Sequence, residues 1–152
     1  MQLTDLLTID RIKIPLVSTT KDDVLRELVE VVADDEADSE RAELLRAVRD
    51  REAVLSTGIG NGVAIPHGKS PLLPELRMAA GTAHKPVEFD ALDGQPVKLL
   101  FLLVGPESAA GPHIKALSRI ARLIRNDDVR KRLLSAETPE EFFRALRDAE
   151  HT

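Results

Sequence analysis

The sequence predicts a single compact α/β domain, and three observations support this fold class. Residues 97–104 are almost all apolar and are followed by Gly105-Pro106, which is typical of a strand buried on both faces rather than of a helix. Segments with the hydrophobic spacing of amphipathic helices precede and follow this strand. The chain has 152 residues without an internal repeat or linker, so residues 1–152 are assigned to one domain with a sizeable core.

The N-terminal part predicts a short strand and then a helix. Residues 12–17 are rich in β-branched side chains, and Pro15 among them indicates an edge strand, because proline lacks the N–H that a central strand needs. Thr20, with Asp23 three residues later, resembles a capping box at the start of a helix. Apolar residues at helical spacing continue this helix to about Ala33.

The next segments predict a second helix and two more strands. The acidic residues 34–38 form a polar connector, after which Ser39 is expected to cap a helix that runs to about Arg49. Residues 63–66 and 77–84 have the composition of strands.

Three helices are predicted after the buried strand. The first covers about 113–125, and the second covers about 127–135, with acidic residues at its positive end. The third starts at Thr138-Pro139, where a capping threonine, a proline at the first helical position and the reciprocal Glu141 agree. The side chains of the first of these helices that are expected to face the core are Ile114, Leu117, Ile120, Ala121 and Ile124.

The composition excludes several classes of function. The 21 Lys and Arg residues and 26 Asp and Glu residues give a net charge of −5, which argues against a nucleic-acid partner. The chain has no Cys, so disulfides, thiolate metal sites and cysteine nucleophiles are impossible. No apolar run is long enough to cross a membrane and no signal pattern is present. We therefore expect a soluble, cytoplasmic protein without membrane insertion.

The glycine-rich segment 56–70 resembles two phosphate-binding loops but matches neither. A Walker A loop that ends in Gly68-Lys69-Ser70 needs glycine where Val63 stands, and Pro66 removes one of the N–H groups that would bind phosphate. A dinucleotide fingerprint that starts at Gly58 would need its third glycine one position later. No nucleotide cofactor is therefore predicted.

Two histidines and an arginine are the candidate site residues. His67 stands between Pro66 and Gly68, a setting that can hold an imidazole rigidly with open space in front of it, although a turn that merely contains a histidine has the same local pattern. His113 opens the helix after the buried strand, where unpaired N–H groups suit phosphate oxygens. Arg51 follows the second predicted helix. The alternatives are an exposed cap residue for His113 and a surface arginine for Arg51.

Together these residue types indicate phosphoryl transfer on histidine. A neutral imidazole nitrogen is nucleophilic near physiological pH, so His67 can take a phosphoryl group. Backbone N–H groups, Arg51 and His113 can donate to the phosphoryl oxygens. A metal-dependent hydrolase built on His67 and His113 is the weaker alternative, because no Asp, Glu or His spacing completes a ligand set. We expect no cofactor and no metal.

A longer pattern resembles a known family. Glu52, then Ile59-Gly60, then the run Val63-Ala64-Ile65-Pro66-His67-Gly68 is similar to the active-site signature of the fructose/mannitol-type (type 2) enzyme IIA domains of the bacterial phosphotransferase system. The resemblance covers nearly the whole chain, and segments 56–62 and 89–97 look most like the nitrogen-regulatory IIA branch.

The resemblance implies a mixed five-stranded sheet flanked by helices and a phosphohistidine carrier, a phosphotransferase component rather than a free-standing enzyme. By this resemblance, His67 is phosphorylated on Nε2 by the phosphocarrier HPr or its nitrogen-branch relative, while His113 and Arg51 steady the phosphoryl group. The group then passes to a cysteine of a IIB domain in transport members, or its presence governs binding to regulatory proteins in the nitrogen branch. A stand-alone sugar-permease component and a binding module that carries no phosphate are the alternatives. Ile59, Val63 and Leu72 are expected to form an apolar docking surface around the site.

Overall fold

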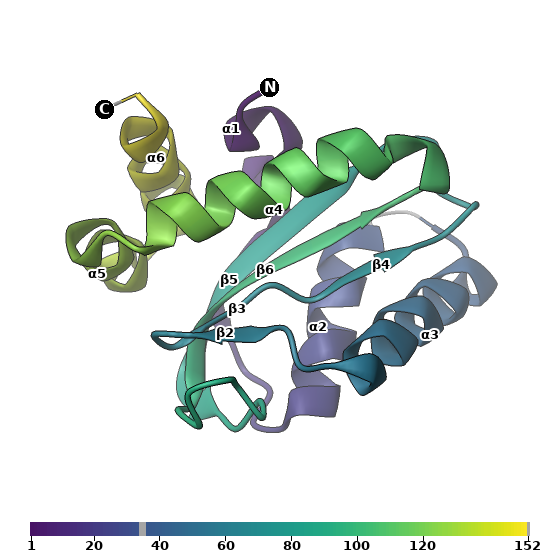
Figure 1. Cartoon of the computed structure of the whole chain (residues 1–152), viewed down its shortest axis with the longest axis horizontal. Helices are drawn as coiled ribbons and strands as arrows, with labels where there is room; N and C mark the ends of the chain where they lie inside the picture. The colour runs from purple at the N-terminus through teal and green to yellow at the C-terminus, as the bar shows by residue number, and fades with distance from the viewer. Residues whose placement is uncertain (34–35, 152) are drawn as a thin grey trace.

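A mixed sheet runs through the middle of the computed structural model, which describes residues 1–33 and 36–151 (Figure 1). Within these residues the strands are β1 (Ile12–Leu16), β2 (Gly58–Gly60), β3 (Val63–Ala64), β4 (His67–Lys69), β5 (Arg77–Val87) and β6 (Val97–Gly105). The α-helices are α1 (Leu3–Leu6), α2 (Lys21–Ala33), α3 (Asp38–Val54), α4 (Ala110–Ile124), α5 (Asp127–Ser135) and α6 (Pro139–Glu150). Short 3-10 helices cover Ile9–Arg11 and Glu107–Ala109.

The long strands β5 and β6 form the centre of the sheet. They are antiparallel, and β1 lies parallel to β5 on the outer side. On its other edge β6 pairs in parallel with β3 and then, further along, with β4. In the part of the chain that the structure describes, β2 pairs with β3 and does not extend alongside β4. β4 therefore has β6 as its one partner and forms an edge of the sheet.

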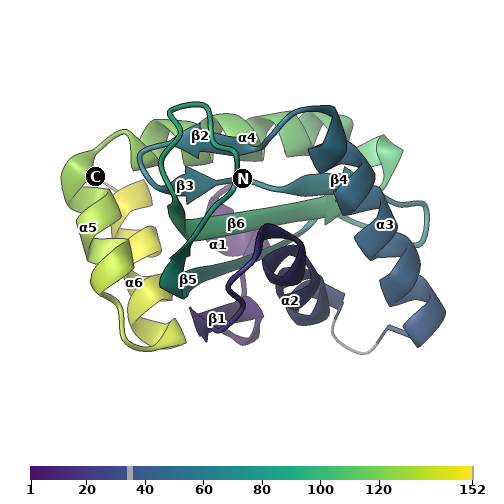
Figure 2. The same ribbon diagram turned by 90° about the horizontal axis from the view of Figure 1, so that it is seen from below.

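The alternation of side chains along β6 divides the core into two halves. Leu99, Phe101 and Leu103 pack on one face, while Leu100 and Leu102 pack on the other. Helices α1, α4, α5 and α6 cover the first face, and α2 and α3 cover the second (Figures 1 and 2). This burial on both faces confirms the expectation from the apolar run.

The sheet has six strands in the described residues rather than the five that the resemblance implied. The short strands β2 and β4 and the helix α1 were not predicted. Each has only three or four residues, too few to show a hydrophobic period. The sheet order nevertheless gives the mixed α/β architecture that was expected.

Helix α2 begins as the sequence predicts, whereas α3 differs at both ends. The Thr20 Oγ1 accepts the N–H of Asp23 at 3.2 Å and caps α2. α3 starts at Asp38, so Ser39 lies inside the helix and is not its cap. Its C-terminal end at Val54 lies beyond the predicted Arg49, because no glycine or proline stops the helix there. Residues 34–35 of the acidic connector lie outside the described residues.

The C-terminal helices confirm most of their predicted limits. α5 spans the expected residues, and the Thr138 Oγ1 caps α6 by accepting the Glu141 N–H at 3.1 Å. The Glu141 carboxylate, however, accepts the N–H of Glu137 at 2.9 Å instead of that of Thr138.

Helix α4 begins earlier than predicted, and its inward face is different. The helix starts at Ala110. Its buried residues are His113, Ala116, Ile120 and Ile124. The expectation that Ile114 faces the core was wrong, since its side chain is 64% exposed. The reason is that the buried stripe contains a histidine and an alanine, which a pattern of large apolar residues does not reveal.

Candidate active site

One cavity brings the three candidate residues together from separate elements. Its volume is about 400 Å³. The residues that line it are Ala47 and Arg51 from α3, His67, Gly68 and Lys69 from β4, and His113 and Leu117 from α4. Figure 2 shows α3 and α4 on opposite sides of β4. The cavity that these three elements line is therefore at the edge of the sheet formed by β4.

Gly68 allows β4 to approach α3 closely. A Cβ atom at this position would lie 3.0 Å from the backbone nitrogen of Val48 and 3.1 Å from its Cγ2. These distances leave little room for any side chain, so glycine lets the strand that carries His67 pack directly against the helix that carries Arg51. The sequence Pro66-His67-Gly68 therefore has a packing role in addition to its chemistry.

The His67 ring is oriented by a backbone carbonyl. Its Nδ1 lies 3.0 Å from the oxygen of Ile65. A carbonyl oxygen only accepts hydrogen bonds, so Nδ1 carries the ring proton and Nε2 keeps its lone pair. Burial lowers the pKa of His67 from its ordinary value, the Ile65 carbonyl opposes this, and the positive charges of Arg51 and Lys69 lower the pKa further. The ring is thus a neutral nucleophile at physiological pH.

The second imidazole lies against the first. The ring centroids of His113 and His67 are 5.2 Å apart, with an edge-to-face angle of 70°. His113 is buried, and burial, followed by the charges of His67 and Lys69, lowers its pKa to about 4. His113 is therefore neutral at physiological pH and can donate a hydrogen bond without a permanent charge.

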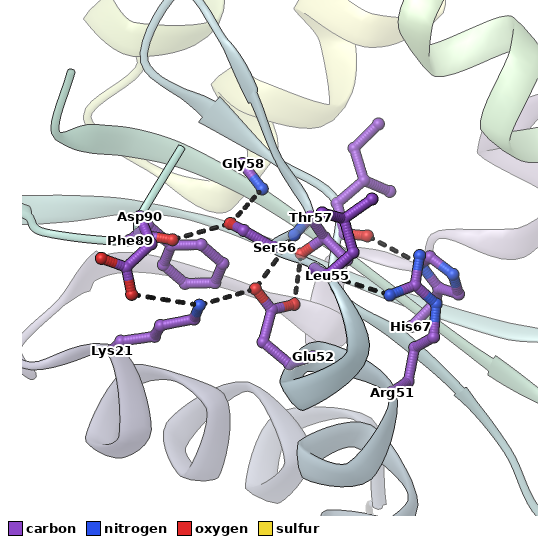
Figure 3. Close-up of polar contacts among 11 residues, drawn as sticks. Lys21, Arg51, Glu52, Leu55, Ser56, Thr57, Gly58, His67, Phe89 and Asp90 are labelled. Carbon is purple, nitrogen blue, oxygen red and sulfur yellow. Dashed lines mark hydrogen bonds and ion pairs between the residues drawn. The ribbon is translucent and has the colours of Figure 1, made fainter. Parts of the chain in front are cut away.

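Arg51 provides a fixed cation at the same cavity. It lies in the last turn of α3, not after the helix as predicted, and its Nη1 donates to the carbonyl oxygen of Leu55 at 2.9 Å. Figure 3 shows the guanidinium beside the ring of His67. A guanidinium presents several donors in a planar fork that suits phosphoryl oxygens. The cavity therefore brings together a neutral imidazole, a guanidinium cation and a second neutral imidazole.

Comparison with known proteins identifies the family of the chain. The model of the family described as "Phosphoenolpyruvate-dependent sugar phosphotransferase system, EIIA 2" matches residues 5–149. The chain belongs to this family. This EIIA domain is 38% identical over 146 residues to the nitrogen regulatory protein of Bradyrhizobium diazoefficiens. The match covers 96% of this chain and 95% of that protein.

Sugar-transport proteins are also relatives of this EIIA domain. It is 38% identical over 138 residues to the fructose-specific EIIABC component of Bacillus subtilis, and the match covers 91% of this chain but 22% of that longer protein. Among solved structures, the nitrogen regulatory protein IIA-Ntr of Neisseria meningitidis superposes with a TM-score of 0.87 at 30% identity, covering 95% of this chain and 98% of that one. The fold is that of the IIA domains.

Two site residues of this EIIA domain had no role in the sequence interpretation. Lys69 lines the cavity two residues after His67, and its Nζ lies 3.4 Å from the Glu107 carboxylate. Alternation along a strand places residues i and i+2 on the same side, which could have indicated it. Glu52 stood in the family signature without a role, and it is a buried carboxylate beside Arg51.

The expected apolar docking surface is only partly present. Ile59 and Leu72 are exposed, but Val63 is 0% exposed, because its side chain packs in the core on one face of the sheet. Leu55 and Ile114 lie close in the chain to residues that line the cavity. The exposed fractions of their side chains are larger than those of Ile59 and Leu72. The apolar surface of this EIIA domain therefore includes the end of α3 and the start of α4.

The described residues offer neither a cluster of metal ligands nor a membrane-spanning helix. In the described ranges, no three His, Cys, Asp or Glu side chains lie together as ligands for a metal ion, so the hydrolase alternative finds no ligand set there. Over the same residues, no helix combines the length and the apolar character needed to span a membrane.

Proposed function

We propose that this EIIA domain is a phosphohistidine carrier in which the Nε2 atom of His67 accepts and then releases a phosphoryl group. The observation that carries the proposal is the convergence of His67, His113 and Arg51 on one cavity, with the Nδ1 of His67 bonded to a carbonyl. That contact leaves Nε2 as the nitrogen with a lone pair. The proposed donor is a small HPr-like protein phosphorylated on its own histidine.

In the transfer step, the Nε2 lone pair of His67 forms a bond to phosphorus while the nitrogen–phosphorus bond of the donor breaks. The electron pair of the broken bond returns to the donor nitrogen. Positive charge develops on the His67 ring, and the Ile65 carbonyl that accepts the Nδ1–H stabilises it. Arg51 and His113 stabilise the phosphoryl oxygens, since catalysis of this reaction depends mainly on positioning and electrostatics.

Labelling with phosphate tests the proposal directly. With phosphoenolpyruvate and the upstream carriers, we expect one acid-labile phosphate per chain, which His67→Ala abolishes. His84 is an exposed histidine on β5, so His84→Ala is a matched control that should label normally. Labelling of His67→Ala at the normal level would refute the assignment.

We further propose that the carrier acts in the nitrogen-regulatory branch, where the phosphorylated and free forms differ in their binding to regulatory proteins. The match to a nitrogen regulatory protein over nearly the full length of both chains supports this. The alternative is donation to the cysteine of a IIB protein, which the similarity to a fructose-specific component favours. Rapid discharge of the phosphorylated form by a purified IIB protein would support the transport role. The cytoplasmic location expected from the sequence stays a prediction.

A further inference from the structure

The buried carboxylate of Glu52 does not line the cavity and has no part in the proposed transfer step. Glu52 is 6% exposed and follows Arg51 in the last turns of α3. One of its oxygens accepts the N–H of Thr57 at 2.9 Å and pairs with the Lys21 Nζ at 2.9 Å, and the other accepts the Thr57 hydroxyl at 2.6 Å (Figure 3). A buried charge is tolerated when it is paired and hydrogen-bonded in this way, so Glu52 holds Thr57 firmly.

A path of hydrogen bonds leads from Thr57 to the nucleophile. The carbonyl oxygen of Thr57 accepts the N–H of Ile65 at 3.0 Å. The carbonyl oxygen of Ile65 is the group that lies 3.0 Å from the Nδ1 of His67. Thr57 therefore holds Ile65 from one side, while β6 pairs with the neighbouring Ala64, and the Ile65 carbonyl sets the orientation and the tautomer of the imidazole.

The segment that contains Thr57 is also held from its other side. The Ser56 hydroxyl donates to the carbonyl oxygen of Phe89 at 2.7 Å, and it accepts the N–H of Gly58 at 3.1 Å. The Lys21 ammonium that pairs with Glu52 lies 4.8 Å from the centre of the Phe89 ring. The connection between α3 and β2 is thus fixed at two points, and only the Glu52 point leads to His67.

We propose that Glu52 is a positioning residue for the transfer site, which fixes Thr57 and thereby holds His67 with Nδ1 protonated and Nε2 directed into the cavity. This inference rests on the proposed function of His67. A neutral imidazole can carry its proton on either nitrogen, and only the tautomer with a free Nε2 can attack phosphorus. Glu52 also contributes negative charge that raises the pKa of His67, against the larger effect of burial.

The chain offers a matched control. Glu27 is a second buried glutamate, paired with the Lys13 Nζ at 2.7 Å, and it accepts the N–H groups of Val17 and Ser18 at 3.0–3.1 Å. Its burial and partners are of the same kind as those of Glu52, but its contacts lead to the β1–α2 connection and not to His67.

Nitrogen NMR of the imidazole rings and phosphorylation kinetics test the proposal together. In the wild-type protein we expect His67 to carry its proton on Nδ1. In Glu52→Ala we expect a mixture of tautomers and a transfer rate at saturating donor that falls by about 10²-fold, with little change in the donor concentration for half-saturation. Thr57→Val keeps the N–H and removes the hydroxyl, so its effect should be intermediate. Glu27→Ala should change neither the tautomer nor the rate.

Two results would overturn the proposal: a wild-type His67 that carries its proton on Nε2, or a Glu52→Ala protein that transfers at the wild-type rate with an unchanged tautomer. If Glu52→Ala does not fold, the wild-type tautomer and Thr57→Val decide. Failure of the proposed function gives a different pattern. In that case the wild-type protein takes no phosphate on His67, while the tautomer still depends on Glu52.

Discussion

The central strand β6 and the edge strand β4 lie side by side and are built on different principles. β6 has nine residues, is paired along both edges, and buries apolar side chains in both halves of the core. β4 has three residues, pairs with β6 alone in the described part of the chain, and carries a histidine and a lysine toward the cavity. Burial of apolar side chains stabilises β6, whereas hydrogen bonds orient the functional side chain of β4.

The difference implies that stability and transfer can be damaged separately. Substitutions in β6 should lower the free energy of unfolding and leave the transfer rate of the folded protein intact. Truncation of the side chains that line the cavity near β4 should instead lower the transfer rate and leave the free energy of unfolding nearly unchanged.

The largest expected effect on stability is that of Phe101→Ala. Phe101 is completely buried and packs against Phe142 with a centroid distance of 6.0 Å. Truncation leaves a cavity, so the free energy of unfolding should fall by about 3–5 kcal/mol. Denaturant unfolding measures the loss of stability and gives the folded fraction, and phosphorylation at low temperature gives the transfer rate. A transfer rate per folded molecule that dropped tenfold would show that the two regions are not separable.

Arg51→Ala should have the converse effect. Removing one group that stabilises developing charge lowers the transfer rate by about 10²-fold, which is equivalent to about 3 kcal/mol of transition-state stabilisation. Arg51 is only partly buried, so the free energy of unfolding should change by less than about 1 kcal/mol. Stopped-flow labelling and urea unfolding of the same variant give both numbers, and a normal transfer rate would remove Arg51 from the site.

Gly68→Ala should affect both properties, because Gly68 joins the two regions. The new methyl group would meet the backbone of Val48, so we expect a loss of about 1–3 kcal/mol in stability from overpacking. The same displacement moves His67 relative to Arg51 and should slow transfer. Gly94→Ala is a poor control, since its positive φ adds strain, and Gly111→Ala, with open space around it, is the better one. Equal behaviour of the Gly68 and Gly111 variants would contradict the packing argument.

The smallest expected effects concern pH. Because burial lowers the pKa of His67 from its ordinary value, the decline of the transfer rate at acid pH, when Nε2 becomes protonated, should occur at a lower pH than for an ordinary histidine. His113, with its pKa lowered to about 4, binds fewer protons folded than unfolded between that value and 6.5. Its contribution to stability is therefore complete above pH 6.5 and is lost as the pH falls toward 4. Urea unfolding of the wild-type protein and His113→Gln should show a smaller pH dependence in the variant, and identical slopes would be the contrary result.

The same contrast explains what the sequence could predict. The apolar run of β6, the helical spacing of α2 and the capping residues at the start of α6 are strong signals, and the structure confirms them. β4 is too short for any period, and its strand character comes from pairing with β6, which is a tertiary contact. The local setting of His67 singled it out, but the sequence interpretation assigned no role to Lys69.

Glu52 illustrates the remaining limit. Its partners are Thr57, close in the chain, and Lys21 on another helix. A glutamate near the end of a helix is ordinarily a solvated surface residue, so its burial is visible only when α2 and α3 are packed together. The resemblance to a family marked its position without indicating what its carboxylate does.

The edge of β4 that pairs with no other strand among the described residues has a consequence for the lifetime of the proposed phosphohistidine. A ring at the margin of the sheet is within reach of another protein's side chain without the movement of a lid. This position suits the proposed receipt of a phosphoryl group from one protein and its transfer to a second. The same exposure admits water to the phosphorus atom. The lifetime of the proposed phosphohistidine therefore depends on the rate of hydrolysis relative to the rate of transfer to the next protein, and the second rate increases with the concentration of that protein.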